Sequence, residues 1–367
     1  MKIKYVIKQR IKNILAIIIS IFSPIIVLFL DKFQDFVIYT VNKRSKSKFF
    51  FSHHKRPVKA SDVPIEYIWD TDNVDFSDVA IVIQGPIVSD RDFTYQTVLL
   101  YKKFYKNINI IVSTWNDSDT DAVRKLQDEC CVILNKKPRV SGSHNINFQK
   151  KTTFAGLIHA KKLKCKYAIK TRSDQRFYSW TTIPLFKKIL ADNPPYLNNF
   201  IENRIIELTM SVCKFRPWSM CDMFQFGLTS DLIKMWSFPD DERSQTAYEY
   251  SQTKYKIRDL LEENVAEMFI HRNLAKNIGV SDNIAHENYY DFMRKYFYLV
   301  DKEIVDLFWF KYTSQEYNVS GNGMYDKNQT VAMLRASDFL MMNEDNEKIK
   351  LELRNLSNYL DRYENWF

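Results

Sequence analysis

Two short apolar runs constrain the fold of this chain more than any other feature. Residues 79–83 read VAIVI and residues 108–112 read INIIV, and residues 93–105 between them carry apolar side chains at helical spacing. A continuous apolar run is typical of a strand that is covered on both faces. Strand, helix and strand in this order predict a parallel sheet with flanking helices.

The same alternation continues along the chain. We expect helices over residues 119–128 and 152–163, and strands over residues 131–134 and 167–169. The prediction is therefore an α/β fold with a mostly parallel sheet flanked by helices. Together with the features described below, this pattern divides the chain into three predicted regions. They are a membrane anchor and tether over residues 1–60, a catalytic domain over residues 76–280 and a helical C-terminal extension over residues 281–367.

Polar side chains gather where the predicted strands end. Ligands of parallel sheets bind outside the carboxyl ends of the strands, which share one edge. Each cluster taken alone is more often a helix cap or a solvated helix start. Their convergence on one edge predicts a ligand site built from residues 84–86, 113–119, 145–151 and 172–174.

The stretch over residues 164–176, KCKYAIKTRSDQR, carries the strongest chemical signal. Asp174 offers a hard oxygen ligand for a divalent metal such as Mg or Mn, and Arg172 offers several donors to a diphosphate. The alternative is a solvated Arg-Asp pair at a plain strand end. We expect Asp174 to bind metal and diphosphate, with Arg172 beside it.

Two further carboxylates are candidate catalytic bases. Asp222 precedes an apolar alternation at residues 223–228, where a carboxylate at the mouth of a strand can accept the proton of an incoming hydroxyl. Glu263 and Glu267 are four residues apart on a predicted helix and face the same side, and we retain Glu263 as the second candidate. The alternatives are a capping aspartate and a solvated helix face.

Composition excludes several classes of protein. Only seven glycines occur, and neither a dinucleotide fingerprint nor a P-loop is present. The five cysteines form no C-x-x-C pair, which favours a reducing compartment over a disulfide framework. Phosphate must therefore be bound by side chains, single turns or a metal.

The basic charge is confined to the N-terminus. Residues 1–60 hold thirteen Lys and Arg against two Asp. The positive charge of this segment is therefore larger than the net charge of the whole chain, which is +9, and the remaining residues are slightly acidic. That distribution predicts an anionic membrane surface as a partner and excludes nucleic acid.

Within this basic segment lies the uncharged run Ile14–Leu30. As a helix its seventeen residues span about 26 Å, slightly less than a bilayer core, and Pro24 would kink it. Cations flank both sides, as expected for an anchor that lies in one leaflet. We predict the cytoplasmic face of the bacterial inner membrane; a spanning helix and a cleaved signal peptide are the alternatives.

Several short motifs in order resemble one family. QGPI at 84–87, STW at 113–115, NIN-Q at 145–149, K-x-R-S-D at 170–174 and DMFQFG at 222–227 resemble the WavE family of bacterial lipopolysaccharide-synthesis proteins. The order of strands, helices and polar turns resembles the nucleotide-binding half of GT-A glycosyltransferases. The resemblance covers roughly residues 78–274.

This resemblance implies roles for individual residues. Asp174 stands where GT-A enzymes place the last acid of their D-x-D motif, whereas Arg172 replaces the first acid and partly takes over from a metal ion as a charge clamp. Phe148 stands where the family pattern has arginine, so Lys150 or Lys151 would carry that charge. The other donor-binding positions implied are Gln84, Gly85, Asp117, Asn147 and Gln149, with Gln84 and Asp117 near the base and ribose.

The implied activity is transfer of a sugar from a nucleotide-sugar donor to a cell-surface glycan or lipid-linked glycan, in lipopolysaccharide or capsule biosynthesis. Two alternatives remain open. One is a nucleotidyl- or phosphotransferase on the same kind of sheet, and the other is a non-catalytic membrane-associated scaffold.

Overall fold

The computed structural model describes two units separately. Contacts divide the chain into Met1–Arg56 and Pro57–Phe367. The described residues are 33–43, 54–64, 74–196, 200–210, 212, 216–243, 255–256, 265–283, 286–312, 334–344 and 363–364. The apolar run Ile14–Leu30 lies outside these ranges, and within them no helix has both the length and the hydropathy to cross a bilayer.

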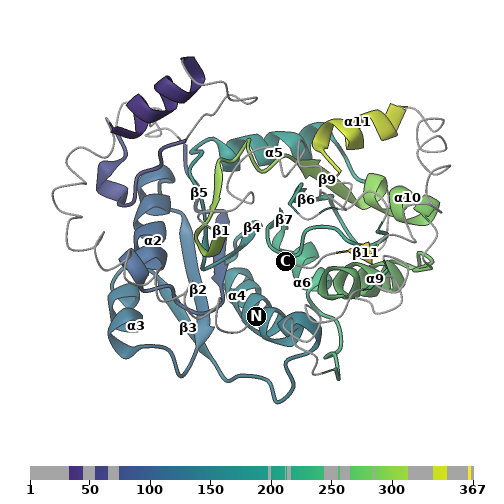
Figure 1. Ribbon diagram of the computed structural model, residues 1–367. Helices are drawn as coiled ribbons and strands as arrows, with labels where there is room; N and C mark the ends of the chain where they lie inside the picture. The colour runs from purple at the N-terminus through teal and green to yellow at the C-terminus, as the bar shows by residue number, and fades with distance from the viewer. Residues whose placement is uncertain are drawn as a thin grey trace, which may run out of the picture. The chain divides into compact units, whose positions relative to one another are not determined.

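A seven-stranded sheet forms the centre of the second unit (Figure 1), with the strand order β3-β2-β1-β4-β7-β6-β9. The first four of these strands are parallel, β7 is antiparallel to both of its neighbours, and β6 and β9 are parallel to each other. The predicted mostly parallel sheet is thus confirmed. The strands are β1 (Val79–Gln84), β2 (Asn109–Trp115), β3 (Cys131–Asn135), β4 (Tyr167–Arg172), β6 (Ile205–Leu208), β7 (Gln225–Leu228) and β9 (Phe297–Val300).

Helices cover both faces of this sheet (Figure 1). α4 packs along β1 and β2, and α6 packs on β7 and β4. α4 begins at Ile146, earlier than the sequence pattern predicts, because left-handed His144 and Asn145 end the preceding turn. The described α-helices of this second unit are α2 (Phe93–Phe104), α3 (Thr120–Gln127), α4 (Ile146–Lys162), α5 (Thr182–Asp192), α6 (Thr229–Met235), α9 (Ala266–Ile278), α10 (His286–Tyr296) and α11 (Ala336–Glu344).

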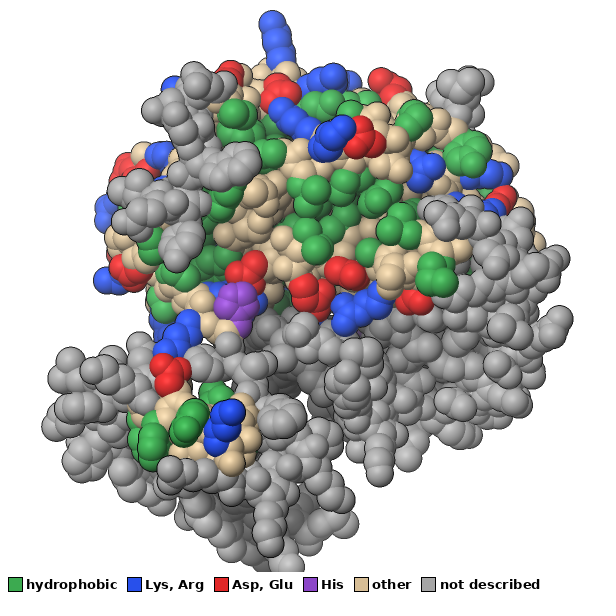
Figure 2. Space-filling model, turned by 90° about the horizontal axis from the view of Figure 1, so that it is seen from above, with side chains coloured by type: hydrophobic (Ala, Val, Ile, Leu, Met, Phe, Trp, Pro, Cys, Tyr) green, Lys and Arg blue, Asp and Glu red, His purple; other side chains and the backbone are tan. Residues whose placement is uncertain are grey.

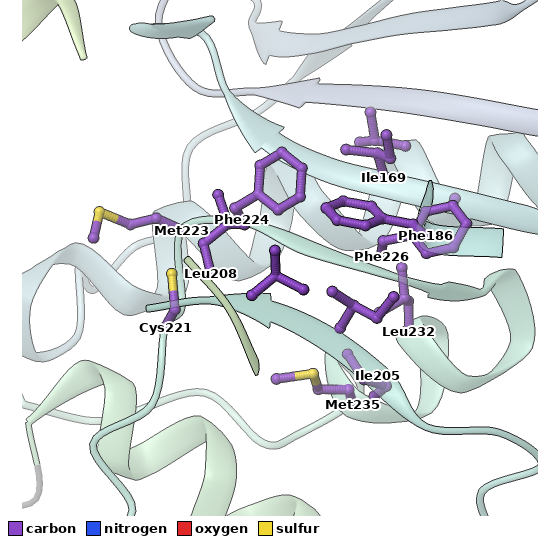
Figure 3. Packing of buried hydrophobic residues seen from close by; sticks show 14 of the residues in the cluster. Ile169, Phe186, Ile205, Leu208, Cys221, Met223, Phe224, Phe226, Leu232 and Met235 are labelled. Atoms are coloured by element: carbon purple, nitrogen blue, oxygen red, sulfur yellow. The ribbon is translucent and has the colours of Figure 1, made fainter. Parts of the chain in front are cut away.

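The two faces of the sheet have different packing. On one face, Phe186 of α5 lies 5.4 Å between ring centroids from Phe226 of β7, and Ile169 of β4 is the register partner of Phe226 (Figure 3). On the other face α4 approaches β1 so closely that a Cβ at Gly156 would lie 2.3 Å from a methyl group of Val82. Glycine is therefore required for this helix to cover the sheet.

The C-terminal region corrects one expectation. We predicted a helical extension over residues 281–367, yet residues 297–300 form the edge strand β9 of the central sheet. β10 (Leu307–Trp309) pairs antiparallel with β5 (Gln175–Phe177), which follows β4. The helical prediction was wrong for these residues because short aromatic runs are compatible with both structures, and only a strand partner decides between them.

The surface on the side of α5 and α11 mixes charge with apolar area. Figure 2 shows hydrophobic side chains gathered near the middle of this face, with lysines, arginines and carboxylates of both signs around them. Among the described residues of the whole unit, the exposed apolar side chains include Tyr196, Ile304 and Leu340. Single exposed apolar residues are common on soluble domains, so this face alone assigns no function.

Candidate functional site

The sheet has a topological switch point between β1 and β4. From β1 the chain proceeds to β2 and β3 on one side, and then returns to β4 on the other side of β1. Ligands of open α/β sheets bind in the crevice at such a point, outside the carboxyl ends of the strands. Gln84 and Arg172, the last residues of β1 and β4, are register partners there.

Backbone contacts lock the two strand ends together. The Ser173 amide donates to the Gln84 carbonyl at 2.9 Å, and the Ser173 hydroxyl donates to the Pro86 carbonyl at 2.5 Å. Gly85 has φ +115°, and a Cβ there would lie 3.0 Å from the Ser173 hydroxyl oxygen. The backbone conformation at this turn therefore requires glycine at position 85. The Gln84 side chain points to α4, where it accepts a hydrogen bond from the Thr152 hydroxyl at 2.9 Å.

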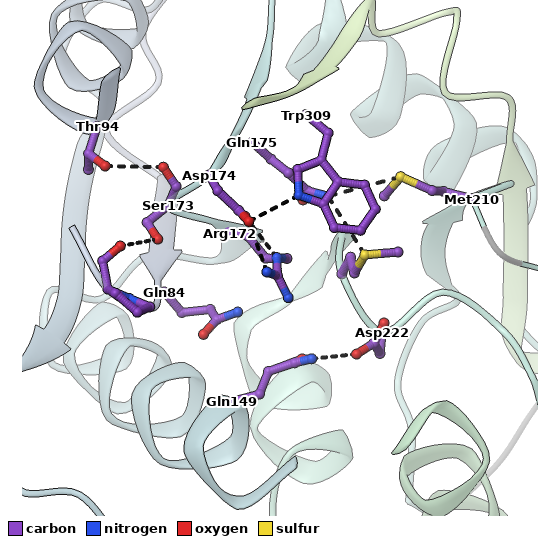
Figure 4. Close-up of polar contacts among 12 residues, drawn as sticks. Gln84, Thr94, Gln149, Arg172, Ser173, Asp174, Gln175, Met210, Asp222 and Trp309 are labelled. Atoms are coloured by element: carbon purple, nitrogen blue, oxygen red, sulfur yellow. Dashed lines mark hydrogen bonds and ion pairs between the residues drawn. The ribbon is translucent and has the colours of Figure 1, made fainter. Parts of the chain in front are cut away.

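Arg172 and Asp174 form a bidentate ion pair at the end of β4 (Figure 4). Arg172 Nε and Nη2 donate to the two Asp174 oxygens at 2.8 and 2.9 Å, and Trp309 Nε1 donates to Asp174 Oδ2 at 3.0 Å. The guanidinium also lies 5.4 Å from the centre of the Trp309 ring. Burial acts to raise the pKa of Asp174, but the Arg172 charge and these hydrogen bonds outweigh it and the pKa is lowered.

These contacts test whether a divalent ion fits at Asp174. Both carboxylate oxygens already accept hydrogen bonds, and the nearest charge partner is the Arg172 cation. Among the described residues, no group of three or more His, Cys, Asp or Glu side chains is arranged to hold a metal. The Asp174 carboxylate therefore fits a guanidinium partner better than a metal ion.

Asp222 forms the second centre, in the loop before β7. Asp222 is 7% exposed, and its carboxylate accepts a hydrogen bond from Gln149 Nε2 of α4 (Figure 4). Its main-chain carbonyl accepts a hydrogen bond from Lys170 Nζ of β4. The same ammonium group lies 3.5 Å from Gln149 Oε1, so three elements of the fold converge on this aspartate.

Three titratable groups around Asp222 have shifted pKa values. Burial, followed by the Asp222 charge, raises the pKa of Glu267 to about 7. Burial lowers the pKa of His144 to about 4 despite Asp222, and Arg216 also acts to lower it. Burial likewise lowers the pKa of Lys170 to about 8, against the opposing effect of Asp222. Several perturbed groups around one carboxylate are typical of functional sites.

Sequence reasoning did not select Lys170 or Glu267 as site residues. Lys170 lies inside the K-x-R-S-D motif, but a lysine within a strand carries no visible sign of burial. Glu267 shares a predicted helix face with Glu263, and the interpretation retained Glu263 instead. Glu263 lies outside the described residues, so its predicted role stays a prediction.

The structure places the remaining predicted residues away from these two centres or gives them other contacts. Asp117 is paired with Lys137 at 2.6 Å on the surface, and the hydrogen bond from Lys137 lowers its pKa. The buried Asn147 amide bonds the main chain of Asp241 through both its nitrogen, at 2.8 Å, and its oxygen, at 2.9 Å. Lys151 is exposed on the first turns of α4.

Comparison with known proteins identifies the family. A search of curated proteins found no match. The family model described as WavE lipopolysaccharide synthesis matches residues 79–322, which include the whole switch-point edge, Asp222 and the β10 tryptophan. This chain belongs to the WavE lipopolysaccharide-synthesis family.

Proposed function

We propose that this protein is a glycosyltransferase that moves a sugar from a nucleotide-sugar donor to a cell-surface glycan in lipopolysaccharide or capsule biosynthesis. One observation carries the proposal. An arginine suited to a diphosphate and a carboxylate suited to a proton are held at the same edge of an α/β sheet (Figure 4). The GT-A resemblance and membership of a lipopolysaccharide-synthesis family support it.

In this proposal Arg172 binds the donor diphosphate. Its side chain is 29% exposed, and Asp174 and Trp309 orient its guanidinium group. A planar guanidinium matches two phosphate oxygens, and its charge offsets the negative charge that develops on the leaving nucleoside diphosphate. Gln84 lies beside this position, because its carbonyl accepts a hydrogen bond from the Ser173 amide, and Gly85 forms the turn that follows Gln84.

Asp222 is the proposed base. The acceptor hydroxyl attacks the anomeric carbon, the bond from that carbon to the diphosphate oxygen breaks, and the hydroxyl proton passes to the Asp222 carboxylate. Gln149 holds one oxygen of this carboxylate, which leaves the other oxygen for the proton. The products are the extended glycan and a nucleoside diphosphate.

The membrane partner is proposed from the first unit. The helix over residues 33–43 exposes Phe33, Phe36 and Tyr39, which are 64%, 63% and 56% exposed. Together with the basic segment this is the composition of a helix that lies at an anionic membrane surface. A soluble donor and a lipid-linked acceptor would meet there, at the cytoplasmic face of the bacterial inner membrane.

The direct test uses the full-length protein in detergent. It is incubated with a panel of nucleotide sugars and lipid-linked acceptors from a lipopolysaccharide-producing bacterium, and release of nucleoside diphosphate is measured. We expect acceptor-dependent release for one donor, reduced about 10³-fold in Asp222→Asn. Parallel reactions with manganese, with magnesium and with a chelator measure metal dependence. Absence of release with every donor would overturn the proposal.

One observation favours a non-catalytic scaffold instead. Both oxygens of Asp174 are already paired with donors from this chain, as in a structural ion pair. A scaffold predicts that no nucleotide raises the melting temperature. Our proposal predicts that a nucleoside diphosphate raises the melting temperature and that this effect is lost in Arg172→Ala. The nucleotidyltransferase alternative is tested separately, because it predicts release of pyrophosphate in the donor assay.

A further inference from the structure

A row of polar side chains crosses the interior of the sheet. Lys170 of β4 is the register partner of Gln225 of β7, which is in turn the register partner of Glu207 of β6. All three side chains are fully buried. Charged residues in the middle of a sheet are rare, because removal of a charge from water costs several kcal/mol.

The two ends of this row have different partners. At the β6 end Glu207 Oε1 lies 3.0 Å from His271 Nε2, and His271 Nδ1 lies 2.6 Å from the carbonyl of Glu267. That carbonyl fixes a proton on Nδ1, so a second proton is shared between Nε2 and the Glu207 carboxyl. Whichever group holds that proton, the Glu207–His271 pair is neutral overall.

At the β4 end the ammonium group of Lys170 forms no ion pair with a carboxylate among the residues that the structure describes. It donates to the Asp222 main-chain carbonyl and to the Gln149 amide oxygen, and it lies 4.7 Å from the centre of the Trp236 ring. These partners come from three different elements, namely the loop before β7, α4 and the end of α6. The lysine therefore connects them at one point.

The two contacts of Lys170 act on the same carboxylate. The first fixes the main chain of Asp222, and the second fixes the oxygen side of the amide whose nitrogen donates to Asp222 Oδ2. Rotation of the Gln149 amide would bring its oxygen toward the carboxylate, and Lys170 opposes that rotation because it needs the oxygen as an acceptor. Side chain and main chain of Asp222 are thus both oriented from the sheet interior.

We propose that Lys170 is the positioning residue for Asp222 in sugar transfer: it contacts no substrate, and it sets the orientation in which the Asp222 carboxylate receives the acceptor proton. This inference rests on the proposed function. Lys170 is enclosed by the sheet, α4 and Trp236, so it cannot touch a substrate. It therefore acts on the reaction through Asp222.

A purely structural lysine predicts the opposite behaviour on substitution. Replacement of a buried charge by an apolar side chain of similar length is often neutral or stabilising. A structural role therefore predicts that Lys170→Met keeps both fold and turnover. The positioning role predicts that Lys170→Met keeps the fold and the donor KM, while kcat falls about 100-fold, the scale expected for a misplacement of about 1 Å.

The experiment compares three variants of the full-length protein with the wild type. Lys170→Met removes the ammonium group, and Gln149→Leu breaks the same network from α4, where the side chain is only partly buried. Thr171→Val is the matched control: its hydroxyl is buried without a partner among the described residues, on the next position of β4, and it makes no contact with Asp222. Melting temperature, donor KM and kcat are measured for each.

The expected result is a loss of kcat in both Lys170→Met and Gln149→Leu at unchanged donor KM, with Thr171→Val like the wild type. Unchanged kcat in either of the first two variants overturns the inference. If Lys170→Met fails to fold, Gln149→Leu decides the question. If the wild type turns over no nucleotide sugar, the proposed function fails, whereas an active wild type with fully active variants refutes only the role of Lys170.

Discussion

The Asp174 turn and the Asp222 loop are both carboxylate centres, yet they are built in opposite ways. Asp174 pairs with Arg172, two residues earlier in the chain, and its pKa is lowered. Asp222 is held by Gln149 and Lys170, which are 73 and 52 residues away in sequence. The first centre is mainly local, with one added contact from Trp309, and the second exists only when α4, β4 and the β7 loop come together.

This difference suggests a division of labour. A carboxylate that is paired with a guanidinium is suited to orient that cation, and in our proposal it orients Arg172 toward the donor. A carboxylate that shares its surroundings with Glu267 and Lys170, whose pKa values are raised and lowered toward neutrality, is suited to exchange a proton.

The largest effect is expected at Asp222. Asp222→Asn keeps the shape of the side chain but removes the proton acceptor, so kcat should fall about 10³-fold, within the usual range for a general base. Donor KM should stay near the wild-type value because the proposal places the diphosphate contacts at Arg172. Steady-state kinetics measures both quantities. A variant that loses donor affinity and keeps kcat would exchange the roles of the two centres.

The next effect concerns the Arg172–Asp174 pair. Asp174→Asn leaves the guanidinium without its charge partner, so the free energy of unfolding should fall by about 1–3 kcal/mol, as for other charged hydrogen bonds. Urea denaturation with an unchanged slope measures this change. Asp121→Asn, in the exposed Arg124–Asp121 pair, is the control and should leave the midpoint unchanged. Equal stability of wild type and Asp174→Asn would show that the pair is not closed in solution.

A pH dependence separates the two centres further. Because the pKa of Glu267 is raised from 4.5 to about 7, its protonated form stabilises the fold below pH 4.5, and this contribution is lost as the pH rises through 7. Glu267→Gln removes that loss. The variant should therefore gain melting temperature relative to the wild type at pH 8 and gain little at pH 5. Equal differences at the two pH values would place Glu267 in a more hydrated environment.

The smallest effect is expected at Asp117. Its pair with Lys137 is exposed, so Asp117→Ala should leave the melting temperature unchanged. If the side chain contacts the donor nucleotide, as the resemblance implies, donor KM rises by about threefold to tenfold while kcat is constant. Kinetics with the donor found above measures this. A wild-type KM would confine donor binding to the β1 and β4 ends of the switch point.

The parallel half of the sheet was predictable from local sequence. The runs that became β1 and β2 are apolar, and the α-helix between them, α2, carries apolar residues at helical spacing. Each of these signals extends over no more than about fifteen residues. The strand ends at Gln84 and Arg172 were predicted to share one edge, and their register pairing confirms it. The family resemblance was likewise confirmed by the match over residues 79–322.

The other half of the sheet was not predictable in the same way. β9 and β10 lie in an aromatic stretch that was expected to be helical, and their strand partners, β6 and β5, lie about 90 and 130 residues earlier. Lys170 gave no sign of burial, because its neighbours in sequence do not reveal that α4 and Trp236 close over it. Asn147 was expected at the donor, and its amide instead bonds the main chain of Asp241.

The sequence by itself determined the order of strands and turns in the parallel half of the sheet and the proximity of Arg172 and Asp174, because each depends on residues that are close together in the chain. It also named Asp222 as a candidate base. Only the tertiary structure decided the surroundings of that base. Protonation and orientation depend on burial and on charges from other elements, and the packing of α4, α6 and α9 on the sheet sets both.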